Sequence, residues 1–140
     1  MKLFEIVAHR GVPNEAPENA LEAFQHAVKL GADAIEFDVS LTADGILVIY
    51  NYFYLEEITN TSGTIFNITY NQLQKVKVIN NQNQRINNYR ILTFNELLET
   101  NDDQIGLEVE IKCPKPESVE IIGGILNCPN NVFYIELIAI

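Results

Sequence analysis

The sequence predicts an α/β fold with a parallel sheet. Short apolar runs alternate with segments of helical periodicity, and charged side chains stand where several of the apolar runs end. Strands that alternate with helices form parallel sheets, in which functional groups gather at the carboxyl ends of the strands. A chain of 140 residues has room for one hydrophobic core, so we expect residues 1–140 to form a single domain.

The chain begins with the pattern of a strand, a helix and a second strand. Residues 6–8 form an apolar run that ends in a polar loop containing glycine and proline. Apolar residues recur at helical spacing over residues 19–30, and the glycine that follows is suited to end a helix. Residues 34–39 alternate with a period of two, which places Glu36 and Asp38 on the same face of the next strand.

The stretch after the second strand is less regular. Asp44-Gly45 is a turn signal ahead of the apolar run 46–50, and it predicts a hairpin-like excursion or a short extra strand. Residues 51–88 are rich in Asn, Gln, Thr and Tyr. We expect a long loop there, with one short helix around residues 70–76.

The last third of the chain returns to alternating helices and strands. Thr93, followed by Glu96, predicts a capping box at the start of a helix. Residues 107–112 alternate again and predict a further strand. A helix capped by Ser118 and a last strand over residues 132–135 complete the order.

Composition excludes several classes of partner. The chain has 9 Lys and Arg against 19 Asp and Glu, a net charge of −10, which repels nucleic acid and anionic lipid surfaces. A local positive group can still hold a phosphate. No stretch is long enough to span a bilayer, and the first residues do not form a signal-peptide core. We therefore expect a cytoplasmic protein without a transmembrane segment, whose cysteines, Cys113 and Cys128, are free thiols.

Charged residues at the predicted strand ends form one candidate site. Glu36, Asp38 and Glu110 would supply three carboxylates, a set of hard oxygen ligands suited to Mg²⁺ or Ca²⁺. His9 and Arg10 follow the first strand and suit a phosphate ester. The alternative is that alternating Glu and Asp residues face solvent on an antiparallel sheet, and the residues alone leave both interpretations open.

Five segments of the chain resemble, in this order, the glycerophosphodiester phosphodiesterase family. They are Ala8-His9-Arg10-Gly11, Pro17-Glu18-Asn19-Ala20, Gly31-Ala32-Asp33-Ala34-Ile35-Glu36-Phe37-Asp38-Val39, Thr42-Ala43-Asp44-Gly45 and Glu108-Val109-Glu110-Ile111-Lys112. The resemblance extends from about Ile6 to Ile135. It implies a TIM barrel of the (β/α)₈ type and a phosphoric diester hydrolase of lipid metabolism. Such an enzyme uses a divalent metal to cleave small glycerophosphodiesters to glycerol 3-phosphate and an alcohol.

The resemblance also implies a role for each candidate residue. The metal ligands would be Glu36, Asp38 and Glu110. Arg10 would bind the phosphate, and His9 would be one of two catalytic histidines. Lys112 would lie near the phosphate, and Asn19 would support the loop that carries His9.

Two features depart from the family pattern. Where the family has a His-Asp pair, this chain has Asn51-Tyr52, so Asn51 replaces the second catalytic histidine. An amide can donate a hydrogen bond to phosphate but cannot transfer a proton near neutral pH, and losing such a group costs roughly 10²–10⁴-fold in rate. The chain also has about half of the ~250 residues of a (β/α)₈ barrel. We therefore expect an incomplete domain, the first half of the barrel. It would be a fragment, a decayed gene product, or half of an assembled barrel whose open strand edges are covered in a homo-oligomer.

Three functions remain open on these grounds. The first is metal-dependent phosphodiester hydrolysis, impaired or lost through Asn51. The second is a non-catalytic module, a pseudoenzyme that keeps metal or phosphate binding or serves in assembly. The third is a phosphoinositide- or sphingomyelin-type phospholipase on the same barrel, which the segments 17–19 and 42–45 fit less well.

Overall fold

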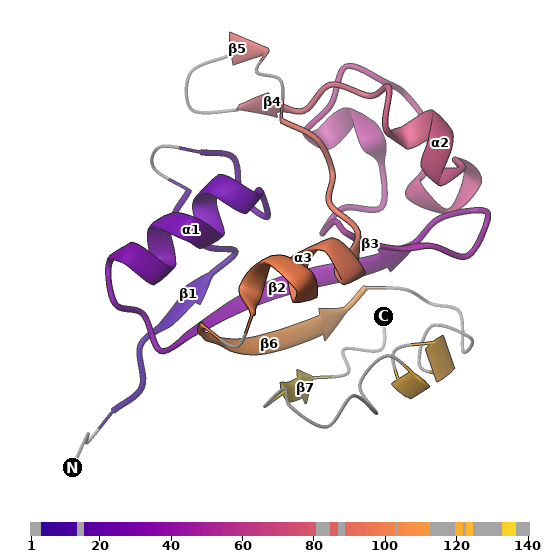
Figure 1. The fold of residues 1–140 in the computed structure, drawn as a ribbon. Helices are drawn as coiled ribbons and strands as arrows, with labels where there is room; N and C mark the ends of the chain where they lie inside the picture. Colours follow the sequence, from indigo (N-terminus) through magenta and orange to yellow (C-terminus); the bar gives the residue numbers. More distant parts are fainter. Residues whose placement is uncertain are drawn as a thin grey trace.

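A mainly parallel sheet organises the chain (Figure 1). The computed structural model describes residues 4–13, 16–80, 85–86, 89–102, 104–112, 120–121, 123–124 and 133–136. Within these residues, the sheet has the order β1-β2-β6-β7, and a fifth strand, β3, pairs with β2. The strands are β1 (Val7–His9), β2 (Ala34–Leu41), β3 (Leu47–Ile49), β6 (Gly106–Ile111) and β7 (Phe133–Glu136). All pairings within this sheet are parallel except that of β2 with β3, which confirms the predicted parallel α/β order.

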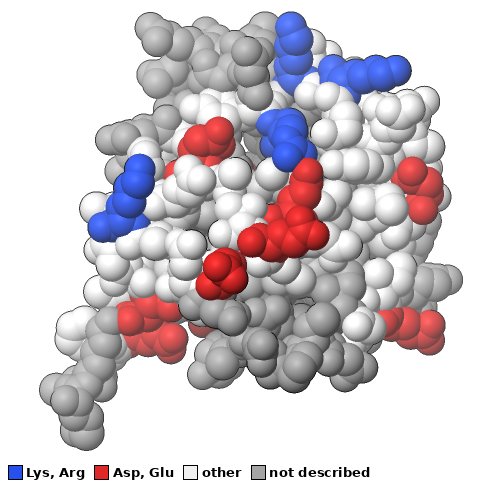
Figure 2. Space-filling view, in the orientation of Figure 1, with Lys and Arg blue, Asp and Glu red and all other residues white. Residues whose placement is uncertain are grey.

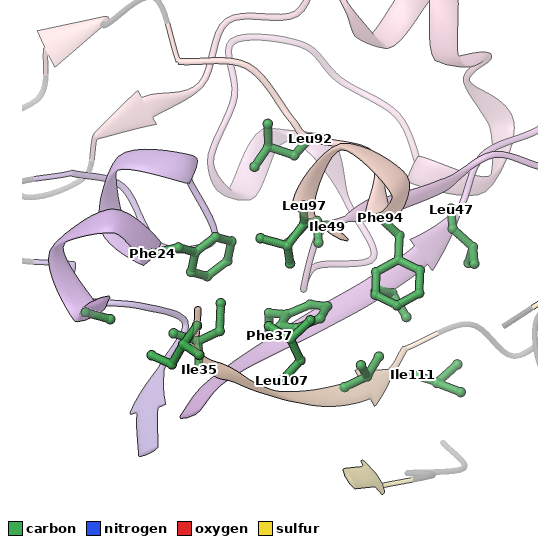
Figure 3. Close-up of a cluster of buried hydrophobic side chains, with 14 of the residues drawn as sticks. Phe24, Ile35, Phe37, Leu47, Ile49, Leu92, Phe94, Leu97, Leu107 and Ile111 are labelled. Carbon is green, nitrogen blue, oxygen red and sulfur yellow. The ribbon is translucent and has the colours of Figure 1, made fainter. Parts of the chain in front are cut away.

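Two helices, α1 (Leu21–Lys29) and α3 (Phe94–Asn101), lie on one side of the sheet (Figure 1). Figure 3 shows how their side chains meet those of the strands in the main core. Phe24 of α1 and Phe94 of α3 contact Phe37 of β2, with ring centroids 6.0 and 5.8 Å apart. Burial of these large rings between helices and sheet is a major stabilising contribution to the fold.

The other face of the sheet carries the carboxylates. Every second side chain of β2, from Ile35 to Leu41, lies in the main core, so Glu36 and Asp38 point to the opposite face. β6 alternates in the same way and presents Glu110 on that face. The parallel register places Asp38 beside Glu110 and places Glu36 beside His9.

The predicted turn at Asp44-Gly45 joins β2 to β3. Gly45 has a φ of 79°, and the Thr42 hydroxyl donates to Asp44 Oδ1 at 2.7 Å. Ile46 N donates to Thr42 Oγ1 at 3.0 Å, which ties the two ends of the turn together. The hairpin-like excursion expected from the sequence is confirmed, because β3 runs antiparallel to β2.

The segment after β3 contains more structure than the predicted loop with one helix. It forms two short 3₁₀ helices, Leu55–Glu57 and Ile65–Asn67, then α2 (Tyr70–Leu73) and a hairpin of β4 (Ile79–Asn80) and β5 (Arg85–Ile86). These elements lie in the upper part of Figure 1, above the sheet and away from β6 and β7. The predicted helix is confirmed but is shorter than expected, and the prediction of a long loop is wrong.

A second hydrophobic core explains why this segment is ordered. Its buried members are Val48, Tyr50, Leu55, Ile58, Ile65, Leu73, Val76, Val78 and Ile91. Leu47 and Ile49 belong to the main core, whereas Val48 and Tyr50 belong to the second core. β3 and the residue after it therefore separate the two cores, with alternate side chains on each side.

The end of the chain agrees with the prediction where the structure describes it. Thr93 caps α3, since Glu96 N donates to its hydroxyl at 3.0 Å and Thr93 N donates to Glu96 Oε2 at 2.8 Å. The capping box is confirmed, and β7 confirms the last strand. Ser118, the predicted cap of a further helix, lies outside the described residues, as do Cys113 and Cys128.

Acidic side chains are spread over the face that carries α1 and α3, with one group near its centre (Figure 2). Basic side chains lie above and to the left of this central group in the same view. Among the described residues, no helix has both the length and the apolar character needed to cross a membrane.

Candidate active site

The loop after β1 places Arg10 at the carboxyl end of the sheet. Arg10 and Gly11 have φ values of 54° and 82°, which turn the chain back toward α1. A Cβ on Gly11 would lie 2.7 Å from the backbone carbonyl carbon of Ala23, so the close approach requires glycine. Arg10 N donates to Glu36 O at 2.8 Å, and Asn19 N donates to Arg10 O at 3.1 Å. The backbone on both sides of Arg10 is therefore fixed.

Three carboxylates meet beside this loop. Glu36, Asp38 and Glu110 each offer one oxygen, and these atoms lie within 4.8 Å of one another. Asp38 is fully buried, and Glu36 Oε1 is buried without a hydrogen-bond partner among the described residues. Oxygen ligands are those that hard divalent cations prefer, and a buried carboxylate oxygen requires a partner. The donor set therefore fits a divalent metal ion.

The electrostatics of the carboxylates also favour a cation. Burial raises the pKa of Glu36 to about 7, and the charges of Asp38 and Glu110 act in the same direction. Burial likewise raises the pKa of Asp38, although the Arg10 charge and the hydrogen bond that Asn19 Nδ2 donates to Asp38 Oδ2 at 3.3 Å oppose this. Negative charge in the cluster thus needs compensation by a proton or by a cation.

Arg10 and Lys112 supply part of that compensation. Arg10 Nε lies 3.0 Å from Asp38 Oδ2, and Lys112 Nζ lies 3.6 Å from Asp38 Oδ1 and contacts Glu110 Oε1. Burial would lower the pKa of Lys112, but its hydrogen bond to Glu110 and the charge of Asp38 outweigh burial and raise it. Both basic side chains are thus held as cations beside the carboxylates.

Asn51 lies between Arg10 and Asp38. In the amide orientation that satisfies both neighbours, Nδ2 donates to Asp38 Oδ1 at 3.0 Å, and Oδ1 accepts from Arg10 Nη1 and Nη2 at 2.9 and 2.7 Å. The preceding residue, Tyr50, donates its backbone N–H to Asp38 O at 2.9 Å, which sets the position of Asn51. The amide therefore bridges the arginine and the buried carboxylate.

His9 lies at the rim of the group. Its side chain is 72% exposed, and its Nε2 lies 3.7 Å from Glu36 Oε2. Each residue that the sequence predicts for the site thus contacts at least one other residue of the site or lies beside one in the sheet. These residues are His9, Arg10, Asn19, Glu36, Asp38, Asn51, Glu110 and Lys112. The catalytic and binding roles assigned to them remain predictions.

Glu18 and Tyr52 also belong to the group, although no sequence motif predicted a role for them. Arg10 Nη1 donates to Glu18 Oε2 at 3.2 Å, and burial together with the nearby charge of Glu18 raises the pKa of Tyr52 to about 12. Glu18 could have been found, because it precedes Asn19 in one of the segments that carry the family resemblance. For Tyr52, the sequence contains no indication of a role in the site apart from its position next to Asn51.

Sequence comparison places the chain among phosphodiesterases. A sequence model of the glycerophosphoryl diester phosphodiesterase family matches residues 9–123. A glycerophosphodiester phosphodiesterase of Caldanaerobacter subterraneus is 35% identical over 108 residues, which are 76% of this chain and 44% of that protein. One of Bacillus altitudinis is 34% identical over 110 residues, 77% of this chain and 45% of that protein. The chain thus spans about half the length of these curated relatives.

Solved structures of the same class share the fold. A phosphodiesterase of Oleispira antarctica, solved in complex with the product sn-glycerol-3-phosphate, is 27% identical with a TM-score of 0.86. The match covers 96% of this chain and 57% of that one. A glycerophosphodiester phosphodiesterase of Thermotoga maritima is 26% identical with a TM-score of 0.78. That match covers 98% of this chain and 55% of the other. These matches confirm a TIM-barrel type of α/β fold, of which this chain represents a part.

Proposed function

The chain belongs to the glycerophosphoryl diester phosphodiesterase family, and from that premise we propose that it hydrolyses glycerophosphodiesters to glycerol 3-phosphate and an alcohol. The observation that carries this proposal is the meeting of three carboxylates with Arg10 and Lys112 at one end of the sheet. Such a site combines oxygen ligands for a metal with positive groups for a phosphate. The proposed substrate is a small water-soluble molecule, which agrees with the predicted cytoplasmic location.

Glu36, Asp38 and Glu110 would hold the metal, Mg²⁺ or Ca²⁺. Bound there, the cation would supply positive charge next to the phosphate. Arg10 and Lys112 would bind and orient the phosphate from the side of Asp38. Asn19 would keep both Arg10 and Asp38 in place, because it contacts the backbone of one and the side chain of the other.

His9 would be the group that moves a proton. Imidazole exchanges a proton near neutral pH, and the exposed ring reaches both Glu36 and solvent. Asn51 cannot take part in proton transfer. We therefore propose that turnover is lower, by roughly 10²–10⁴-fold, than it would be with histidine at this position.

One observation favours a second function, a non-catalytic metal- or phosphate-binding module. The Asn51 amide is engaged with both Arg10 and Asp38, as a residue that maintains a binding site would be. Both functions are compatible with the retained carboxylates and with His9. A measurement of turnover therefore distinguishes the enzyme from the binding module.

The test is release of glycerol 3-phosphate from glycerophosphocholine in Mg²⁺ or Ca²⁺, for the wild type and Asn51→His. Asn71→His is the matched control, because Asn71 is exposed on α2. We expect slow release by the wild type, faster release by Asn51→His and no change in the control. Release by Asn51→His alone would favour the binding module for the natural chain. If neither protein releases product, and neither binds a divalent cation or inorganic phosphate by calorimetry, both functions are wrong.

A further inference from the structure

We propose that Glu18 is a positioning residue, which together with Asn51 holds the Arg10 guanidinium at the site. Arg10 Nη1 donates to Glu18 Oε2 at 3.2 Å, and the two side chains are 19% and 24% exposed. Carboxylates pair with guanidinium groups through directed, charge-assisted hydrogen bonds, which fix orientation as well as charge. The inference rests on the proposed function only in taking phosphate as the ligand of Arg10.

Asp38 alone is poorly suited to orient Arg10. Its two oxygens already receive contacts from four side chains: Arg10, Asn19, Asn51 and Lys112. It is also one of the three carboxylates that would share a metal ion. Glu18 lies outside that carboxylate cluster. Its negative charge therefore stays with Arg10 when the charge of Asp38 is shared with a cation.

Tyr52 lies close to Glu18 and packs against the second core. Burial raises the pKa of Tyr52 to about 12, and the negative charge of Glu18 acts in the same direction. The Tyr52 ring packs edge-on against buried Tyr50, with centroids 6.0 Å apart. The surroundings of Glu18 on this side are thus a packed part of the molecule.

The backbone around Glu18 is also tied to Arg10. Asn19, the next residue, has a φ of 59° and donates its N–H to Arg10 O. Ala16, two residues before Glu18, is 1% exposed. A segment fixed on both sides of Glu18 therefore meets Arg10 through the backbone and again through the carboxylate.

The Arg10 guanidinium itself provides the first test, in the protein without ligand. The sequence has three arginines, Arg10, Arg85 and Arg90, so their side-chain N–H resonances can be assigned by NMR. We expect slow rotation of the Arg10 Nη groups in the wild type and several-fold faster rotation in Glu18→Gln. Glu22→Gln is the matched control, because Glu22 is exposed on α1 and the charge change is the same. Unchanged rotation in Glu18→Gln would overturn the proposal.

Binding of inorganic phosphate, measured by calorimetry with Mg²⁺ present, provides the second test. Removing a negative charge near Arg10 should by itself strengthen anion binding, whereas losing the position of Arg10 should weaken it. We expect about 10-fold weaker binding by Glu18→Gln and little change in Glu22→Gln. Equal or tighter binding by Glu18→Gln would contradict the proposal. A wild type that binds no phosphate would contradict the proposed function instead, while the NMR result still decides the role of Glu18.

Discussion

At the scale of single residues, charge balance around Asp38 dominates the site. Three carboxylates lie within one small cluster, and Glu18 adds a fourth nearby, whereas Arg10 and Lys112 are the positive groups in contact. Buried charge is tolerated only when it is paired, so an excess of carboxylates destabilises the protein unless protons or cations compensate. The raised pKa of Glu36 is a direct consequence.

The raised pKa of Glu36 predicts how a divalent cation changes stability with pH. The pKa of Glu36 is about 7 in the folded protein, against an ordinary value of 4.5. Protonation of Glu36 therefore contributes its full share to the stability of the fold below about pH 4.5. That stability is lost as the pH rises through about 7. A cation binds the deprotonated form, so Mg²⁺ should raise the melting temperature more above about pH 8 than below about pH 5.

The measurement is thermal unfolding with and without Mg²⁺ at the two pH values. Glu36→Gln should remove most of the pH dependence of the cation effect. Glu99→Gln is the control, since Glu99 is exposed on α3, and it should behave like the wild type. An equal Mg²⁺ effect at both pH values would show that Glu36 does not bind the cation.

Residue-scale prediction from the sequence succeeded where strand alternation decides the outcome. Glu36 and Asp38 share a face because a strand has a period of two, and the parallel register brings Glu110 beside them. The pairing of Glu18 with Arg10 could not be predicted, because it depends on two residues with left-handed backbone, Arg10 and Asn19, near the two ends of the connection between β1 and α1. Sequence patterns carry little information about such positions.

At the scale of elements, the contact between the β1 loop and α1 sets the position of Arg10. Gly11→Ala should therefore lower the free energy of unfolding strongly, because its Cβ would meet the Ala23 backbone at 2.7 to 2.8 Å. Gly31→Ala is a matched control: Gly31 also has positive φ, 76°, but no atom lies within 4 Å of its added Cβ. We expect a loss of about 1–2 kcal/mol for Gly31→Ala, from backbone strain alone, and a larger loss for Gly11→Ala. Equal losses in urea unfolding would contradict the close approach.

Elements with strong local signals were predicted well, and those without them were not. The capping box at Thr93 is local, involving residues three apart, and it formed as expected. The buried residues after β3, such as Leu55, Ile65 and Leu73, are spaced too irregularly to predict a helix or a strand. They are ordered by packing between segments distant in sequence, which no local pattern reports.

At the scale of the whole molecule, the two cores should have different effects on the site. Leu73 and Leu107 are both buried, one in each core, and replacing either by Ala should cost about 2–5 kcal/mol. Leu73→Ala should in addition loosen Tyr50 and hence Asn51 and Tyr52. Hydrogen exchange should therefore rise at residues 50–78 in Leu73→Ala, with less change in β2 and β6. If hydrogen exchange rises equally across both cores in Leu73→Ala and in Leu107→Ala, the two cores unfold as one unit.

The edge of the sheet at β1 bears on whether copies of the chain associate. Among the described residues, β1 pairs with β2 alone, so its other edge faces none of the described strands. Phe4, Ile6 and Val7 around this strand are 70%, 50% and 37% exposed. An apolar strand edge pairs readily with another strand, and charged side chains oppose such pairing. We therefore propose a homo-oligomer that covers this edge.

Sedimentation analysis over a range of concentrations tests the proposed association. We expect larger species as the concentration rises, and a shift toward monomer in Ile6→Lys, because the lysine places charge at the strand edge. Leu30→Lys is the matched control: Leu30 is 74% exposed but lies at the end of α1 rather than on the strand. If Leu30→Lys dissociates the protein as well as Ile6→Lys does, general surface hydrophobicity drives association. A wild type that stays monomeric throughout would mean that the β1 edge is stable without a partner.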